Sequence, residues 1–186
     1  MLLFVYLKEK EKYCIMLLFP FEGWTLKEKQ MKTLIMLSAV PAAGKTTWAK
    51  MYQEEHDNVY IINSDDVRME LTNGNYQDRS KQKEVWELFE RRIHEYANKG
   101  DDVTVILDAL NDVNTVRYKY LSTTPEYDHK ILVLFPTTLD KSMKFNSARV
   151  WPNKVPDDVL VALNNKFEPP SREVLDLVDE VITVEW

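Results

Sequence analysis

Residues 39–47 read Ala-Val-Pro-Ala-Ala-Gly-Lys-Thr-Thr, and only Ser38 separates them from the apolar run Leu-Ile-Met-Leu at residues 34–37. The stretch matches the pattern GxxxxGK[ST] at every fixed position except the first, where Ala39 replaces glycine. Between a strand and a helix, such a loop wraps successive backbone N–H groups around a phosphate at the helix N-terminus, whose dipole favours negative charge. The sequence therefore predicts a polyphosphate-binding loop.

This loop assigns expected roles to its own residues. Lys45 is expected to bridge the β- and γ-phosphates of ATP, and Thr46 to offer its hydroxyl to Mg²⁺. The expected nucleotide contacts are Ala42, Ala43, Gly44, Lys45, Thr46 and Thr47. The alternative is an ordinary strand-turn-helix with a chance Gly-Lys-Thr. Because alanine tolerates a positive φ less well than glycine, Ala39 is expected to shift the loop slightly without abolishing binding.

Strand-like and helical stretches alternate from residue 31 onward, which is typical of βαβ units around a parallel sheet. A helix is predicted over residues 80–98, ending at Gly100 as its C-cap. The strand candidates are residues 34–39, 58–63, 103–107, 130–135 and 180–185. We predict an α/β protein with a three-layer α/β/α P-loop NTPase fold, a parallel sheet of about five strands and a helical lid.

Length and composition limit the organisation of the chain. Its 186 residues are enough for one compact domain, which we place at residues 31–186. Residues 1–30 are an extension of unknown role, either a small hairpin or the product of a start codon assigned too early. Cys14 is the single cysteine, so no intramolecular disulfide forms, and a reducing cytoplasmic location is expected. Neither apolar run of the first thirty residues reaches the length that spans a bilayer, so no membrane contact is predicted. The net charge of −6 argues against a broad cationic face for duplex nucleic acid.

Asp65 and Arg68 lie in the block Asn-Ser-Asp-Asp-Val-Arg at residues 63–68, where the second strand ends. Substrates of open α/β sheets lie over the carboxyl ends of the strands. Asp65 is therefore expected to accept the proton of an attacking hydroxyl, and Arg68 to clamp an anionic group of the acceptor. The alternatives are an aspartate that only caps the next helix and a solvated surface arginine.

Asp108 and Asn111 follow the third strand, in the stretch Asp-Ala-Leu-Asn at residues 108–111. A carboxylate after a buried strand is typical of a Walker B position, so Asp108 is expected either to hold Mg²⁺ through water or to orient Lys45. Asn111 is expected to orient Asp65 or contact the acceptor, and a turn-forming role is the equal alternative.

Arg149 belongs to a basic stretch, residues 141–149, that follows the fourth strand. Phosphoryl transfer needs positive charge over the transferring group, and a closing lid can supply it. Arg149 is therefore expected to contact ATP and act in catalysis. A solvated basic helix is the alternative.

With these elements in one order, residues 34–184 resemble the kinase domain of phage-type polynucleotide kinases and their small P-loop relatives. The resemblance rests on Gly-Lys-Thr-Thr-Trp-Ala at 44–49, on the 63–68 and 108–111 blocks, and on Asn-Ser-Ala-Arg at 146–149 followed by Val-Pro at 155–156. It implies a general base at Asp65, an acceptor-phosphate ligand at Arg68 and an ATP contact at Arg149. Phe145 departs from that pattern, because the family's lid block begins with arginine, and no Asp-x-Asp-x-Thr stretch of a phosphatase occurs.

Three functions are consistent with these features. The first is an ATP- and Mg²⁺-dependent kinase for the 5′-hydroxyl of a nucleic-acid end or a nucleotide. The second is a P-loop kinase for a small molecule such as a nucleoside, sugar or antibiotic. The third is an ATP-binding switch that hydrolyses ATP without an acceptor.

Overall fold

The structure is a computed structural model that describes residues 8–9, 12–13, 30–75, 77–150 and 153–185. Two short strands near the amino terminus, β1 (Lys8–Glu9) and β2 (Lys12–Tyr13), pair antiparallel. Cys14 and most of the predicted 1–30 extension lie outside the described residues, and the role of that extension stays a prediction.

The other five strands form one parallel sheet in the order β4-β5-β3-β6-β7. They are β3 (Lys32–Ser38), β4 (Val59–Asn63), β5 (Val103–Asp108), β6 (His129–Leu134) and β7 (Glu180–Thr183). Each overlaps a predicted strand, with ends that differ by at most two residues. The predicted five-stranded parallel sheet is confirmed.

The described residues also form seven helices. They are α1 (Lys45–Glu55), α2 (Ser64–Leu71), α3 (Gln82–Ala97), α4 (Asn114–Ser122), α5 (Leu139–Ser147), α6 (Asp157–Lys166) and α7 (Arg172–Leu175). The predicted C-cap of α3 was wrong, because Asn98 and not Gly100 is the cap, and its N–H already bonds to the carbonyls of Glu95 and Tyr96.

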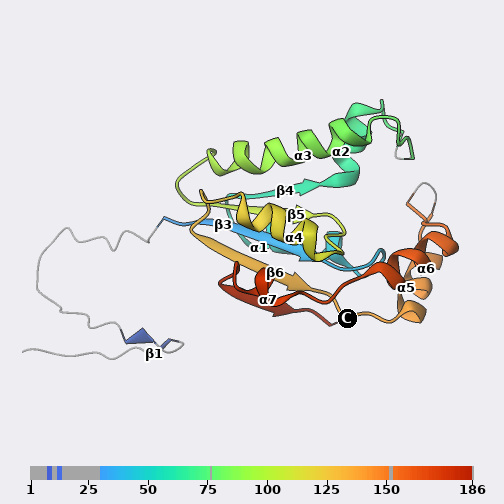
Figure 1. The fold of residues 1–186 in the computed structure, drawn as a ribbon. Helices are drawn as coiled ribbons and strands as arrows, with labels where there is room; N and C mark the ends of the chain where they lie inside the picture. The colour runs from blue at the N-terminus through green and yellow to red at the C-terminus, as the bar shows by residue number, and fades with distance from the viewer. Residues whose placement is uncertain (1–7, 10–11, 14–29, 76, 151–152, 186) are drawn as a thin grey trace, which may run out of the picture.

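Alternating side chains of the central strand β3 divide the core into two layers. Leu34 and Met36 pack in the cluster formed with α3, α4 and α7, whereas Ile35 and Leu37 pack in the cluster formed with α1. This alternation follows from the two-residue repeat of a strand covered on both faces. Figure 1 shows α3 and α4 on one side of the sheet and α1 behind it. The predicted three-layer α/β/α arrangement is confirmed.

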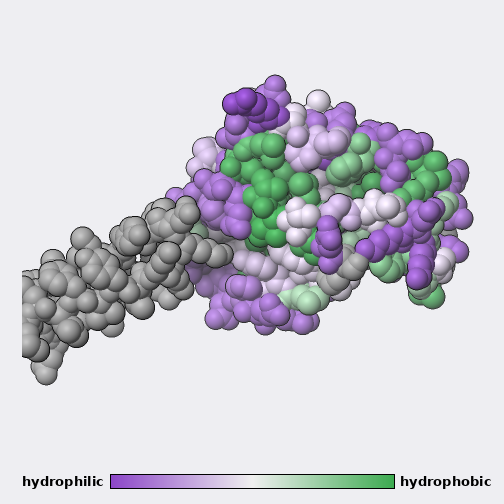
Figure 2. Space-filling model, turned by 90° about the horizontal axis from the view of Figure 1, so that it is seen from below, coloured by the Kyte–Doolittle hydropathy of each residue, from purple (hydrophilic) through white to green (hydrophobic). Residues whose placement is uncertain are grey.

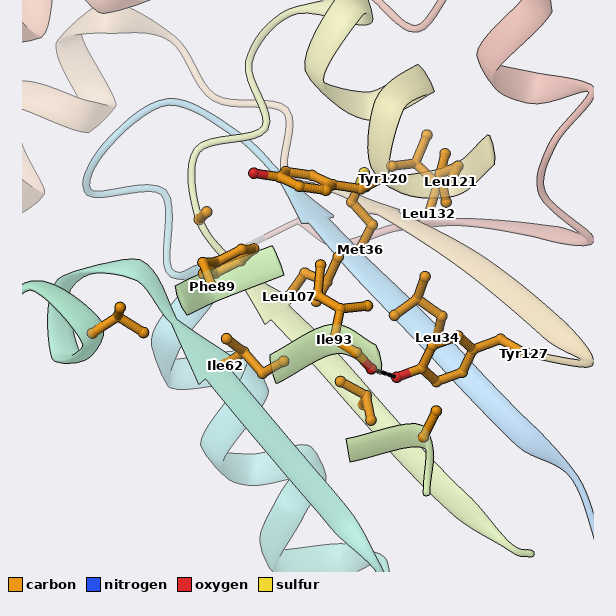
Figure 3. Close-up of a cluster of buried hydrophobic side chains, with 14 of the residues drawn as sticks. Leu34, Met36, Ile62, Phe89, Ile93, Leu107, Tyr120, Leu121, Tyr127 and Leu132 are labelled. Carbon is orange, nitrogen blue, oxygen red and sulfur yellow. Dashed lines mark hydrogen bonds between the residues drawn. The ribbon is translucent and has the colours of Figure 1, made fainter. Parts of the chain in front are cut away.

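The larger cluster is built around aromatic and aliphatic side chains from α3, α4 and the strands (Figure 3). Phe89 and Tyr120 lie with ring centroids 5.7 Å apart. The Tyr127 hydroxyl donates a hydrogen bond of 2.6 Å to the carbonyl of Ile93, so the one polar atom of that buried ring is satisfied. This cluster packs α3 and α4 against the sheet.

The helices α5 and α6 pack on each other and stand apart from the sheet, at the end toward which its strands point (Figure 1). The 39–44 loop leaves β3 at the same end. A helical pair therefore faces the phosphate-binding loop, in the position predicted for a lid.

The strand β7 forms one edge of the sheet. Its Val181 and the nearby Leu175 of α7 are 43% and 41% exposed, and Figure 2, which views the molecule from the side where β7 and α7 lie, shows apolar surface among hydrophilic residues. The exposed Glu180 stands beside Val181 on this strand, and the exposed Glu185 lies two residues beyond its end. Charges on an edge strand oppose pairing with another chain.

Candidate active site

The 39–44 loop turns through two residues in the left-handed backbone region, Ala42 (φ 61°) and Gly44 (φ 92°). Gly44 is the N-cap of α1, so the chain enters the helix with its first N–H groups free to bind an anion. Ala39 does not need a left-handed backbone, because its φ is not positive and its N–H donates to the Leu110 carbonyl at 3.1 Å. The conformational demand falls on Ala42 instead. The slight shift of the loop expected from Ala39 stays a prediction.

Lys45 is the buried cation of this loop, with 8% of its surface exposed. Its Nζ donates to the carbonyls of Ala39 (3.1 Å) and Val40 (3.0 Å), so the loop binds its own lysine. Burial lowers the pKa of Lys45 to about 8, opposed by the charge of Asp108 and assisted by that of Arg149. A phosphate at the loop would offer this ammonium a stronger partner than two carbonyls.

The buried charge of Lys45 predicts a pH-dependent stability. Its folded pKa of about 8 lies below the ordinary lysine value of 10.5, so the unfolded chain binds more protons between these pKa values and stability rises with pH. Lys45→Met has no such group. We expect the free energy of unfolding of the wild type to gain about 2 kcal/mol relative to Lys45→Met between pH 7 and 9.5. Urea unfolding of both proteins across this range measures the difference, and a pH-independent difference would contradict the lowered pKa.

Asp108 joins the loop to the neighbouring strands. Its Oδ2 accepts hydrogen bonds from Thr46 Oγ1 (2.7 Å) and Asn63 Nδ2 (2.6 Å). Asn63 ends β4 and stands in register with Asp108 at the end of β5, which explains why the two side chains meet. Burial raises the pKa of Asp108, whereas the hydrogen bond from Thr46 and the charge of Lys45 lower it.

The donor set at this point suits a magnesium ion shared with a polyphosphate. The Thr46 hydroxyl and the Asp108 carboxylate are hard oxygen ligands, which Mg²⁺ prefers, and they already lie within hydrogen-bond distance of each other. Within the described part of the chain, no group of three or more His, Cys, Asp or Glu side chains is placed to hold a metal ion. The described residues therefore do not supply a complete set of protein ligands for a metal ion.

Asp65 and Arg68 form an ion pair in α2. Arg68 Nη1 donates to Asp65 Oδ1 at 2.6 Å, and the two side chains are 4% and 44% exposed. Arg68 Nη2 also donates to Gln82 Oε1 at 3.4 Å, while its Nε is buried without a partner. The buried Arg68 guanidinium thus holds the half-exposed carboxylate of Asp65 by a hydrogen bond. The predicted contact of Arg68 with an acceptor phosphate stays a prediction, and it requires the guanidinium to turn outward.

Asn63 is a functional residue that the sequence reasoning did not assign. Its Oδ1 accepts from the N–H groups of Asp65 (2.8 Å) and Asp66, which caps α2, while its Nδ2 binds Asp108. One side chain therefore contacts both the Asp108 carboxylate and the backbone of Asp65. A strand-ending Asn before Ser-Asp-Asp is a recognisable N-cap signal, and it was the available clue.

Arg149 follows α5 and reaches the phosphate-binding loop from the lid. It lines a cavity of ≈ 310 Å³ together with Ala42, Gly44, Thr47 and Phe145. The lid turn that carries it is fixed by Asn146, whose buried amide bonds twice to the backbone of Val155 (2.7 and 3.0 Å). The predicted loop residues and the predicted lid arginine therefore lie on two sides of one cavity.

Asn111 occupies a structural position. Its φ is 45°, its Nδ2 donates to the Leu37 carbonyl at 2.7 Å, and its own carbonyl accepts from Ser38 Oγ at 2.8 Å. These features fit the turn-forming alternative, because asparagine tolerates the left-handed region. The other expectation, a contact with Asp65 or the acceptor, stays a prediction.

Arg117 of α4 is a fully buried hub beside the site. Its guanidinium donates to Ser38 Oγ (3.1 Å), Asn111 O (2.8 Å), Asn114 Oδ1 (2.9 Å), Asp112 O (3.1 Å) and Glu168 O (2.7 Å). The Phe167 ring lies 5.1 Å from the guanidinium carbon. Burial lowers the pKa of Arg117. Arg117 therefore ties the end of β3 to the loop after β5 and to the chain that leaves the lid.

A family model described as chromatin associated protein KTI12 matches residues 32–175, from the first residue of β3 to the last of α7. The matched region includes every residue of the site described above. The chain belongs to the KTI12 family. Among curated proteins, none matches the sequence.

Solved structures place this KTI12-family chain in the P-loop kinase fold. Kti12 from Chaetomium thermophilum, solved with ADP-AlF3, has a TM-score of 0.60 at 17% identity over 82% of this chain and 89% of its own. A fungal RNA kinase has a TM-score of 0.56 at 15% identity, over 83% and 75%. A chain of the Pnkp1/Rnl/Hen1 RNA repair complex has a TM-score of 0.63 at 20% identity, over 76% and 45%.

These likenesses bear on fold and family. The KTI12-family chain spans less than half of the RNA-repair chains that it matches, at 42% and 45% of their lengths. At such identities the comparison shows the fold alone. The prediction of a small P-loop kinase-like protein is confirmed.

Within the described residues, no helix combines the length and apolar character that crossing a membrane requires.

Proposed function

We propose that this protein binds ATP with Mg²⁺ at the 39–47 loop and transfers the γ-phosphate to a hydroxyl group of an acceptor. The observation that carries the proposal is the position of Asp65. Its half-exposed carboxylate stands two residues beyond the end of β4, whose last residue, Asn63, binds both the Asp65 N–H and the Asp108 carboxylate of the neighbouring strand β5. A carboxylate so placed faces the nucleotide from the side on which an acceptor would enter.

Each residue then has one task. Backbone N–H groups of residues 42–47 bind the β-phosphate, and Lys45 exchanges its loop carbonyls for phosphate oxygens. Thr46 and Asp108 would hold Mg²⁺, which neutralises charge on the phosphates when bound. Arg149 adds positive charge from the lid.

The transfer itself is an in-line displacement. The acceptor oxygen forms a bond to the γ-phosphorus while the bond from that phosphorus to the β,γ-bridging oxygen breaks, and ADP leaves. Asp65 accepts the hydroxyl proton as the acceptor attacks.

For the acceptor we propose the 5′-hydroxyl of a nucleic-acid end or of a nucleotide. Arg68 supports this class, because its guanidinium lies next to Asp65 and its Nε has no hydrogen-bond partner in the buried site. Turned outward, it would bind a phosphate beside the reacting hydroxyl. The names of the RNA kinase and RNA repair structures point to the same class. The gluconokinase among the similar structures makes small hydroxylated molecules the comparison to include.

ATP hydrolysis without an acceptor is the second candidate, and the Asp65–Arg68 ion pair favours it. In the observed arrangement the Arg68 side chain is 4% exposed and its two terminal nitrogens donate to Asp65 and Gln82, so an acceptor phosphate has no access to it. Asp65 would then orient a water molecule toward the γ-phosphate.

The test follows the γ-phosphate of labelled ATP. Wild-type protein with Mg²⁺ is incubated with a 5′-hydroxyl oligonucleotide, a 3′-phosphorylated mononucleotide, nucleosides and sugars, and Lys45→Met reports contaminating activity. We expect label on the oligonucleotide or mononucleotide, absent with Lys45→Met. Label on a sugar or nucleoside alone would overturn the acceptor class. Label only as free phosphate would replace transfer by hydrolysis.

A further inference from the structure

An aromatic ring from the lid faces the phosphate-binding loop. The cavity of ≈ 310 Å³ has Ala42, Gly44 and Thr47 on its loop side, and Phe145 and Arg149 on its lid side. Phe145 lies in the last turn of α5 and Arg149 follows that helix, and both residues line this cavity. Phe145 is 39% exposed. An exposed ring beside a polyphosphate site is a surface on which a planar group can stack.

We propose that Phe145 is the platform on which the base of the bound nucleoside triphosphate stacks, and that this protein therefore accepts ATP and GTP about equally. The proposal rests on the proposed nucleotide site. Once Gly44 and Thr47 bind the phosphates, the rest of the nucleotide extends along the same cavity. Phe145 gives the base an apolar partner there, and stacking is tolerant of base identity because every base has a π-face.

The polar groups around this cavity explain the weak selectivity. Among the described residues that line it, Thr47 and Arg149 are the only ones with polar side-chain groups. No Asn, Gln, Asp or Glu side chain is among those lining residues to read the edge of a base. Discrimination between adenine and guanine needs such hydrogen bonds. Stacking alone supplies affinity for a base without discriminating between adenine and guanine.

A second cavity, of ≈ 440 Å³, is the competing place for the base. It touches the loop at Val40, and its walls include Phe135, Phe167 and Asn164. Its two rings are already engaged, since Phe135 packs edge-on against Trp48 at 6.2 Å and Phe167 lies under the Arg117 guanidinium. No ring contact is found for Phe145 among the described residues, so its face is the available one.

The experiment separates the base from the phosphates. Calorimetric titrations of wild type and Phe145→Ala use the Mg²⁺ complexes of ATP, GTP and inorganic tripolyphosphate. Wild type is expected to bind ATP and GTP within about threefold of each other and roughly 5- to 150-fold more tightly than tripolyphosphate, as stacking of one base predicts. Phe145→Ala should lose that advantage for both nucleotides and keep the tripolyphosphate affinity. Phe145→Tyr, which keeps the ring, should retain it.

Asn164→Ala is the matched control for the second cavity, and we expect it to bind all three ligands as the wild type does. Loss of nucleotide affinity in Asn164→Ala would overturn the inference in favour of the second cavity. Equal weakening of ATP and tripolyphosphate by Phe145→Ala, unchanged ATP affinity, or more than tenfold preference for one purine would also overturn it. If the wild type bound none of the three ligands, the proposed function itself would fail, whereas binding of all three without dependence on Phe145 would remove this inference alone.

Discussion

Asp65→Asn is expected to lower the rate of phosphate transfer by ~10²–10⁴-fold while leaving ATP affinity within about twofold of the wild type, because removing a general base acts on the attacking hydroxyl alone. The amide is close in size to the carboxylate, so the cap that Asn63 provides to α2 is kept. Measuring kcat with saturating acceptor, and ATP binding by calorimetry, separates the two effects.

Lys45→Met is the contrasting variant for this prediction. The lysine side chain that this variant lacks would contact the phosphates directly, so we expect both the transfer rate and the ATP affinity of Lys45→Met to fall. Asp65→Asn that weakened ATP binding as much as Lys45→Met would contradict the placement of Asp65 on the acceptor side. Full transfer activity in Asp65→Asn would contradict its role as base.

Arg117→Met is expected to lower the free energy of unfolding by on the order of 3 kcal/mol, since hydrogen bonds to a buried charged group are worth more than neutral ones. The substitution removes five hydrogen bonds and leaves the Glu168 carbonyl without its 2.7 Å donor. It also removes the guanidinium from the Phe167 ring. Urea unfolding measures the loss.

Lys119→Met is the matched control for Arg117, because it lies on the same helix but pairs with Glu90 at the surface, with half of its side chain exposed. We expect it to cost less than about 1 kcal/mol, as surface ion pairs do. Equal stability of Arg117→Met and the wild type would show that the buried hub does not hold the base of the lid in place.

The strands were predictable from the sequence because burial on both faces leaves runs of Val, Ile and Leu, as in the run that became β5. Helix ends were less so. Gly100 resembled a C-cap, yet α3 ends at Ala97, since Asn98 already satisfies the last turn by backbone bonds. The glycine therefore did not mark the end of the helix, because Asn98, two residues earlier, is the C-cap.

The positions of site residues that belong to a sequence motif could be predicted. The positions of side chains that depend on burial could not. Lys45, Thr46 and Asp108 meet because the loop and the end of β5 are adjacent in the sheet, which the order of the strands implies. The inward turn of Arg68 and the hub at Arg117 have no such signal. Both depend on which carbonyls and side chains tertiary packing brings within reach of a guanidinium.

Ala39 is a departure from the motif at a position where the backbone does not require glycine. Its backbone is not left-handed, so the missing glycine costs no strain there. Ala42 takes up the positive φ instead. A pattern written in residue letters does not say which of its positions the backbone geometry constrains.

The central claim is that Lys45, Thr46 and Asp108 hold a magnesium nucleotide while Asp65 faces its γ-phosphate. The most direct measurement is a crystal structure of this protein with ADP, Mg²⁺ and aluminium fluoride. We predict that the nucleotide phosphates lie in the 42–47 loop with Lys45 released from the Ala39 and Val40 carbonyls, and that a carboxylate oxygen of Asp65 lies within hydrogen-bond distance of the oxygen opposite the ADP leaving group. A nucleotide bound elsewhere, or Asp65 turned away from that oxygen, would contradict the account.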